Sequence, residues 1–102
     1  MKQVNDHQEE GLNILQEECA EVIQAASKIK RFGLIGKPIN TTLTNRESLE
    51  MELGDVLALV DLLVASGLGI TEEGIEKARV NKMMRLSKYM HTWDEYSESQ
   101  NV

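Results

Sequence analysis

The sequence predicts an all-α fold, an antiparallel bundle of three to four helices that is completed by oligomerisation. Apolar residues recur at steps of three and four along most of the chain, which is the period of a helix. The alternation of apolar and polar residues that is typical of strands is not sustained, and aromatic residues make up only 4% of the chain. At 102 residues there is room for one small domain, which we place at residues 1–90, followed by a polar tail at 91–102.

The first helix is predicted from about Asn5 to Arg31. Its apolar positions step by three and four without a break, so they form a stripe that packs against another helix. This stripe consists of Leu12, Leu15, Cys19, Val22, Ala26 and Ile29. We therefore expect Cys19 to be a small core residue. Gly33 is expected to end the helix, and the segment 33–43, with two glycines and one proline, is expected to form a loop.

The second helix has a clear predicted start, because Thr44 followed three residues later by Glu47 forms a capping box. Gly67 and Gly69 are expected to end it. Its apolar stripe consists of Leu49, Leu53, Val56, Val60 and Leu63. We expect the stripes of the first two helices to pack together.

The third helix is predicted to begin after Thr71, since a hydroxyl cap followed by Glu72 and Glu73 suits the positive end of the helix dipole. Its apolar side is less regular and consists of Ile75, Ala78, Met83, Leu86 and Met90. The last dozen residues are mostly polar and acidic. We expect them to be frayed, or docked by Trp93 alone.

The second helix also predicts self-association. Nine of the ten residues from 56 to 65 are apolar, so this helix is hydrophobic nearly all round and needs partners on more than one side. One side carries a ribbon rich in small residues that permits close approach across a two-fold axis, Met51, Gly54, Ala58, Asp61 and Ala65. We therefore expect a homodimer or a homotetramer. Asp61 is then either a buried interface acid or an additional site residue.

The composition limits the partners and the location. The chain has 11 Lys and Arg residues and 17 Asp and Glu residues, which gives a formal net charge of -6. This charge disfavours binding of duplex nucleic acid, because the phosphate backbone binds to basic surfaces. The polar opening sequence lacks the apolar region of a signal peptide. The most apolar run is about half of the ~20 residues that a membrane span needs. We expect a soluble, cytoplasmic protein without a membrane partner.

Two pairs of carboxylates lie within apolar helical stretches, Glu18 with Glu21 and Glu52 with Asp55. Three residues is close to one helical turn, so each pair points in one direction and can hold a hard cation. Apolar residues border each pair on its own ribbon, so the pairs can converge if the two helices pack together. Oxygen ligands of this kind suit Mg²⁺ or Mn²⁺. Spacing alone leaves two interpretations open, a shared metal site or two solvated acidic faces.

Other kinds of site find less support in the sequence. A ferritin-like di-iron bundle needs Glu-x-x-His, and neither His7 nor His91 has a glutamate three positions before it. Zinc is disfavoured by one cysteine and two distant histidines. The chain has neither a Walker A loop nor the glycine spacing of a dinucleotide-binding motif.

Three segments resemble the MazG-like members of the all-α nucleoside triphosphate pyrophosphohydrolases, including short stand-alone phage forms: LQEECAEVIQAASKIKRFG, EMELGDVLALVDLL and GITEEGIEKARVNKMMRL. The family signature is E-x-x-E, a spacer, E-x-x-D, and then a helix with basic and amide residues. Its two acidic parts are matched by Glu18, Glu21, Glu52 and Asp55. The spacer of 30 residues after Glu21 is at or slightly beyond the usual upper end. The excess falls in the 33–43 loop and so concerns the substrate pocket more than the metal site.

The resemblance implies hydrolysis between the α and β phosphates of a (deoxy)nucleoside triphosphate, which releases the monophosphate and pyrophosphate. It implies that the four acids hold Mg²⁺, with Mn²⁺ as a possible substitute, and act as the catalytic residues. One of them, or Glu17, would take the proton from the attacking water. In the third helix Asn81, Lys82 and Arg85 match the basic part of the signature and would bind the substrate phosphates. The resemblance also points to dimers or tetramers.

Two alternative functions stay open on the sequence. The chain could be a non-catalytic helical interaction module, in which the apolar stripes are oligomer seams, or it could hydrolyse phosphoribosyl-ATP, the activity of a sister family. The sequence does not indicate which base or sugar is preferred. Residues of the base pocket are expected in the N-terminal segment, in the loop around Gly36 and Pro38, or in another subunit.

Overall fold

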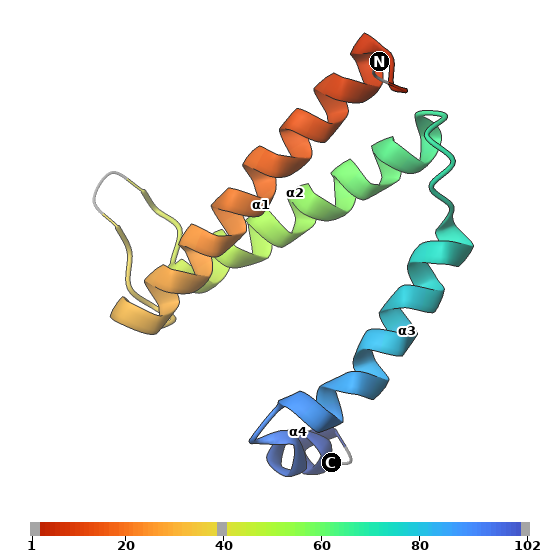
Figure 1. Cartoon of the computed structure of the whole chain (residues 1–102). Coiled ribbons are helices and arrows are strands. Elements are labelled where there is room, and N and C mark those ends of the chain that lie inside the picture. Colours follow the sequence, from red (N-terminus) through yellow and green to blue (C-terminus); the bar gives the residue numbers. More distant parts are fainter. Residues whose placement is uncertain (1–2, 39–40, 101–102) are drawn as a thin grey trace. The chain divides into compact units, whose positions relative to one another are not determined.

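The computed structural model of the chain describes residues 3–38 and 41–100, and these contain four α-helices and no strand. In chain order the helices are α1 (Asp6–Phe32), α2 (Asn45–Ala65), α3 (Glu72–Tyr89) and α4 (Trp93–Gln100), as Figure 1 shows. The predicted all-α class is therefore confirmed. The chain divides into two compact units, Met1–Gly69 with α1 and α2, and Ile70–Val102 with α3 and α4.

Helix α1 begins and ends at residues whose local chemistry favours those positions. The side-chain oxygen of Asn5 accepts a hydrogen bond of 2.8 Å from the backbone N–H of Gln8, and the N–H of Asn5 donates to Gln8 Oε1 at 2.9 Å. This reciprocal pair satisfies groups that the start of a helix leaves without partners. At the other end Gly33 has a φ of 85°, and its N–H donates to the carbonyl of Ile29 at 2.8 Å. A positive φ favours glycine, which explains why the helix ends at the predicted residue.

Helix α2 has the predicted capping box. The hydroxyl of Thr44 accepts a hydrogen bond of 3.1 Å from the N–H of Glu47, and the N–H of Thr44 donates to Glu47 Oε1 at 3.1 Å. The hydrogen bonds from the backbone and the hydroxyl of Thr44 also lower the pKa of Glu47. The helix ends at Ala65, and the two glycines after it have positive φ values of 85° and 87°. The capping and stop signals of α2 are thus local and readable from the sequence.

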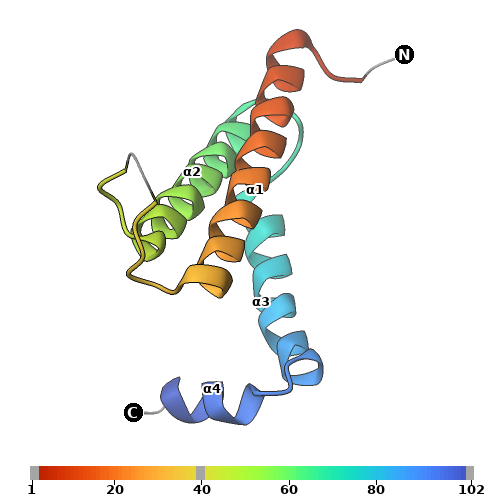
Figure 2. The ribbon, with the colours of Figure 1, turned by 90° about the vertical axis from the view of Figure 1, so that its left-hand side faces the viewer.

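Helices α1 and α2 lie side by side and antiparallel, as both Figure 1 and Figure 2 show. Near the start of α1, Gln8 Nε2 donates to the carbonyl of Ser66 at 2.9 Å. At the opposite end of the pair, Asn45 Nδ2 donates to the carbonyl of Gly33 at 3.0 Å. Gly11 marks a close approach, because a Cβ atom there would lie 3.0 Å from a methyl carbon of Leu62. Two polar contacts therefore hold the ends of the pair, and a small residue lets the helices come close between them.

The predicted packing stripes are confirmed in part, because Leu63 is buried and most of their other members are half-buried. Cys19 is exposed and Leu53 is 47% exposed, although both were expected in the core. The most buried positions of α1 are Gln8, Gly11 and Ala25, and the 14 residues from Gly11 to Ala25 make about four turns, which returns to the same face. A helical period fits two neighbouring ribbons of the same helix equally well. The buried amides and the small residues decide between the ribbons, and they turn the acid-bearing side of α1 towards α2.

The α1–α2 pair leaves much apolar surface uncovered. Among the apolar side chains of the described residues, only Ala25 and Leu63 are buried. Large apolar side chains on α1 and α2 that are at least 40% exposed are Ile23, Phe32, Met51, Leu53, Leu57 and Leu62. None of the helices in the described ranges is long and apolar enough to cross a membrane.

The unit Ile70–Val102 contains one helix that was predicted and one that was not. Helix α3 starts as expected, with the hydroxyl of Thr71 accepting a hydrogen bond of 2.9 Å from the N–H of Gly74. The tail was expected to be frayed, but its described part forms α4. The rings of Trp93 and Tyr96, close to one turn apart, lie 5.1 Å from each other, and the first turn is acidic. Both features favour a helix even in a polar segment.

Candidate functional site

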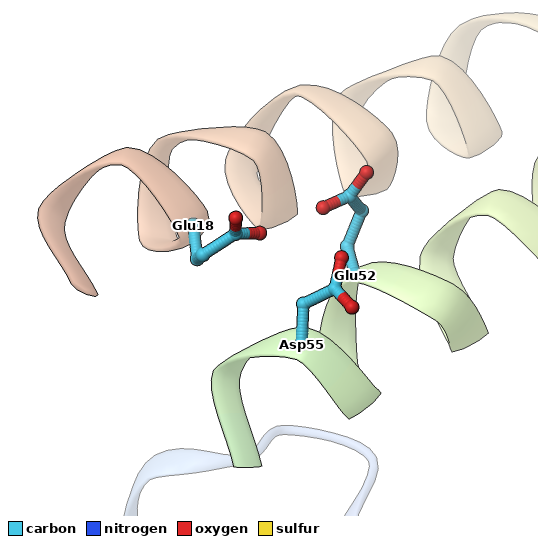
Figure 3. Close-up of side chains that lie close together, drawn as sticks. All are labelled: Glu18, Glu52 and Asp55. Carbon is cyan, nitrogen blue, oxygen red and sulfur yellow. The ribbon is translucent and has the colours of Figure 1, made fainter. Parts of the chain in front are cut away.

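Three carboxylates meet in the middle of the α1–α2 pair. Glu18 extends from α1, and Glu52 and Asp55 extend from α2, with their carboxyl groups gathered between the helices in Figure 3. Each residue offers one oxygen atom such that the three oxygens all lie within 4.8 Å of one another. All three side chains are half-buried. Three oxygens this close together could hold one small cation.

The helix packing explains why these acids converge. Glu18 lies seven residues from both Gly11 and Ala25, so it occupies the same buried ribbon of α1 about two turns from each. Glu52 lies seven residues after the buried Asn45 and therefore shares its face of α2. Asp55 follows about one turn later. The acids thus occupy the seam between the helices, where apolar residues would normally lie.

The electrostatics of the cluster oppose full ionisation. Burial raises the pKa of Glu52 above its ordinary value of 4.5, and the neighbouring charges of Asp55, Glu18 and Glu21 raise it further. Desolvation and like charges both disfavour a carboxylate, so the folded cluster favours a proton or a cation at this point. Without a cation, the ionised form of Glu52 is therefore disfavoured in the folded protein.

Glu21 lies at the edge of this arrangement. It was predicted as a fourth ligand, but its side chain is exposed and it is not part of the group within 4.8 Å. Its negative charge is nevertheless close enough to contribute to the raised pKa of Glu52. The structure thus brings together three of the four predicted acids and leaves Glu21 beside them.

The residues of the cluster fit a hard divalent cation. All the donor atoms are carboxylate oxygens, which Mg²⁺ and Mn²⁺ favour, and the three charges would neutralise a doubly charged ion. Cys19 neighbours Glu18 in the sequence, but the cluster itself contains no thiol or imidazole, which zinc sites usually use.

The three remaining predicted site residues, Asn81, Lys82 and Arg85, lie on α3 and are exposed. The Nζ of Lys82 lies 5.7 Å from the centre of the Tyr89 ring, a cation–π contact within α3. Their expected contact with substrate phosphates stays a prediction.

A cavity that the sequence only partly indicated lies at the end of the α1–α2 pair. Its volume is about 410 Å³, and it is lined by Lys28, Phe32, Gly36, Lys37, Pro38 and Asn45. The loop around Gly36 and Pro38 was expected to contribute to a base pocket. Asn45 was missed. Its position directly after the Thr44 cap marks it only as the first residue of α2, and its burial depends on a contact with Gly33, which lies 12 residues away.

Comparison with known protein families finds one that spans most of the chain. The family model described as the MazG nucleotide pyrophosphohydrolase domain matches residues 6–91. This range includes α1, α2 and α3 and all seven predicted site residues. Comparisons with curated proteins and with solved structures return no match.

Proposed function

The chain belongs to the MazG nucleotide pyrophosphohydrolase family, and from this premise we propose that it hydrolyses a nucleoside triphosphate between its α and β phosphates. The products are a nucleoside monophosphate and pyrophosphate. The observation that carries this proposal is the half-buried group of Glu18, Glu52 and Asp55, whose oxygens converge within 4.8 Å. The convergence of three half-buried carboxylates from two helices supports a shared cation site over two solvated acidic faces.

In this proposal the three converging carboxylates hold Mg²⁺, with Mn²⁺ as a substitute. When bound, the divalent cation supplies the positive charge that a triphosphate needs beside an acidic protein, and it makes water more acidic for attack on phosphorus. The carboxylates hold the site at a fixed place because they extend from two helices that are pinned at both ends of the pair. Glu21 completes the acidic set, either as a further ligand or as the group that accepts the proton from water.

We assign the binding of the departing pyrophosphate to α3. Asn81 and Lys82 are adjacent on this helix and Arg85 follows about one turn later, so together they offer an amide and two positive charges. Cationic donors stabilise the negative charge that develops on phosphate oxygens during transfer. These residues can belong to the same chain as the acids or to a neighbouring subunit.

We also propose that the protein acts as a homodimer or homotetramer in the cytoplasm. The uncovered apolar side chains of α1 and α2 support self-association, because a chain with only Ala25 and Leu63 buried among its described apolar residues has a very small core. Sedimentation at micromolar concentration is expected to show a dimer or a tetramer. A stable monomer would contradict this part of the proposal.

A test of the activity measures pyrophosphate release from a panel of standard and modified nucleotides, with and without Mg²⁺. We expect Mg²⁺-dependent release from at least one nucleoside triphosphate, and loss of release in Glu52→Gln. The panel includes phosphoribosyl-ATP, so that preference for this compound would point to the sister activity. If no nucleotide is turned over, the helical interaction module becomes the better account.

A further inference from the structure

The loop end of the α1–α2 pair exposes three large apolar side chains. Phe32 is 66% exposed, Leu34 is 52% exposed and Ile35 is 78% exposed. They lie within four consecutive residues, where α1 ends and the chain enters the loop to α2 (Figure 1). We call these three residues the tip patch. Their apolar surface is gathered at a turn of the chain, unlike the exposed apolar side chains that are spread along α2.

Hydrogen bonds hold the backbone of this loop against the start of α2. The carbonyl of Leu34 accepts from the N–H of Arg46 at 3.0 Å, and the carbonyl of Gly36 accepts from the N–H of Asn45 at 2.8 Å. The carbonyl of Gly33 accepts from the side-chain amide of Asn45 at 3.0 Å. These three carbonyls thus have partners within the protein, while the tip patch is exposed. This favours entry into apolar surroundings, because backbone groups without partners make such a transfer costly.

The chain around the tip patch is basic, although the whole protein is acidic. Residues 22–46 contain no Asp or Glu, whereas the chain has a formal net charge of -6. Of the basic residues in this segment, Lys28 is half-buried and the others are exposed. The complete set is Lys28, Lys30, Arg31, Lys37 and Arg46. Positive charges therefore flank the tip patch on both sides in the sequence.

The acids that border this segment leave most of its positive charge effective. Glu21 lies nine residues before Lys30 on α1, which is about 14 Å along the helix. Exposed charges interact over about 8 Å at physiological salt, so Glu21 is largely screened from this end. On α2, Glu47 follows the segment directly, and the positive charges of Arg46 and Lys37 help to lower its pKa. Even with Glu47 counted, four of the five positive charges are not balanced.

An anionic lipid surface matches both features of this end of the pair. Nucleic acid would match the positive charge, but its exterior of phosphate and sugar offers little to the aliphatic side chains of Leu34 and Ile35. A two-fold contact of the tip patch with a second copy would bring the same positive charges against one another. A membrane interface offers apolar acyl chains to the patch and negative headgroups to the basic residues.

We propose that the loop end of the α1–α2 pair binds to the surface of anionic lipid membranes. The tip patch enters the boundary between headgroups and acyl chains, and the basic residues of the segment 28–46 contact the headgroups. Membrane leaflets that face the cytoplasm carry anionic lipids and attract such basic segments. This binding differs from the expectation of a protein without a membrane partner, which rested on the length of the most apolar run. Binding at a surface needs no spanning run.

The test is co-sedimentation of the full-length protein with lipid vesicles. One kind of vesicle contains phosphatidylcholine alone, and the other contains phosphatidylcholine and phosphatidylserine in equal parts. We expect binding to the anionic vesicles to be at least about tenfold stronger, because each Lys or Arg near such a surface contributes about a factor of five. High salt should weaken this binding, since it screens the charges.

A variant of the tip patch separates its apolar contribution from that of the charges. Leu34→Ser combined with Ile35→Ser keeps every charge, and neither residue lines the cavity or belongs to the acid cluster. We expect this double variant to bind anionic vesicles at least about tenfold more weakly, because two large aliphatic side chains no longer leave water. Leu57→Ser is the control, since Leu57 is 65% exposed on α2 outside the basic segment. It should bind as the wild type does, and circular dichroism checks that each variant is folded.

Several results would overturn this inference. They are equal binding to both kinds of vesicle, no binding to either, or a loss in Leu57→Ser as large as that in the double variant. If vesicles are not bound and the double variant sediments with a lower mass than the wild type, the tip patch is a contact between copies of the chain. Vesicle binding without hydrolysis of any nucleotide would leave the membrane surface standing and remove the activity. Hydrolysis without vesicle binding would do the reverse.

Discussion

The middle of the α1–α2 pair and its loop end are built by the same two helices but carry opposite charge. In the middle, Glu18, Glu52 and Asp55 converge in the seam and burial raises the pKa of Glu52. At the loop end, residues 28–46 are free of acidic side chains, and two lysines line a cavity. About two helical turns separate the two regions on each helix. One packing seam thus combines an acidic cluster with a cavity that has two lysines in its wall.

The largest effect on activity is expected from a substitution in the cluster of Glu18, Glu52 and Asp55. Glu52→Gln removes a charge from the centre of the cluster while keeping its size, so Mg²⁺-dependent pyrophosphate release should fall by at least about a hundredfold, more than the loss typical of a mutation beside a metal ligand. Circular dichroism should show unchanged helix content. Glu50→Gln is the matched control, because Glu50 is exposed on the same helix and outside the cluster. Undiminished pyrophosphate release by Glu52→Gln would contradict the assignment of this cluster as the metal site.

A pH dependence of stability follows from the same cluster. The folded metal-free protein binds a proton at Glu52 more tightly than the unfolded chain, whose glutamate keeps the ordinary pKa of 4.5. The free energy of unfolding therefore contains a favourable contribution from protonated Glu52. This contribution is fully present below pH 4.5 and is lost as the pH rises through the raised pKa of Glu52 in the folded state.

Urea unfolding of the metal-free protein between pH 4.5 and 7 measures this effect. Glu52→Gln should equal the wild type at the acid end and exceed it in free energy of unfolding at pH 7. Mn²⁺ at about a hundred times its Kd should raise the wild-type value by about 2.7 kcal/mol. A wild type that gains stability relative to Glu52→Gln as the pH rises would contradict the raised pKa.

The helix spacing can be changed without touching either charged region. Gly11→Leu should push α1 away from α2, since even a Cβ atom would lie 3.0 Å from Leu62. Overpacking of this kind costs about 1–3 kcal/mol of stability. It should also weaken Mn²⁺ binding, although every acid is intact. Ala20→Leu, at an exposed position of α1, should do neither. Undiminished Mn²⁺ affinity in Gly11→Leu would show that the acids do not depend on the seam.

The smallest effect is expected from a substitution of a lysine that lines the cavity at the loop end of the pair. Lys37→Gln removes one exposed positive charge from the cavity wall, and such charges are largely screened. We expect nucleoside triphosphate affinity to fall by up to about fivefold at low salt and the difference to shrink at high salt. Uncharged nucleosides should bind as before. A loss of nucleoside binding as large as the loss of triphosphate binding would mean that Lys37 shapes the cavity and does not act through charge.

The sequence predicted what depends on neighbours along the chain. The Thr44–Glu47 capping box, the Gly33 stop and the Thr71 cap each involve residues three or four positions apart, and all are present. The depth to which each position is buried could not be predicted in this way, because adjacent ribbons of one helix share the same period. It depends on contacts such as that of Gln8 with Ser66, 58 residues apart.

In the candidate site, too, the sequence predicted the local features but not those that depend on distant contacts. The spacing of the acid pairs indicated which residues could converge, but the seam decided that Glu18 meets Glu52 and Asp55 and that Glu21 lies beside them. Cys19 was expected in the core but is exposed, whereas Glu18, which was expected beside the seam, lies within it. Asn45 was missed because its buried contact crosses the loop.

The most direct test of the shared cation site is an equilibrium titration of the full-length protein with Mn²⁺, read by the electron paramagnetic resonance of the free ion. The wild type and Glu50→Gln should bind Mn²⁺ saturably and alike. Asp55→Asn should weaken this binding by at least about tenfold, because one of three converging carboxylates loses its charge. Binding of equal strength in Asp55→Asn and the wild type would contradict a site formed jointly by the two helices.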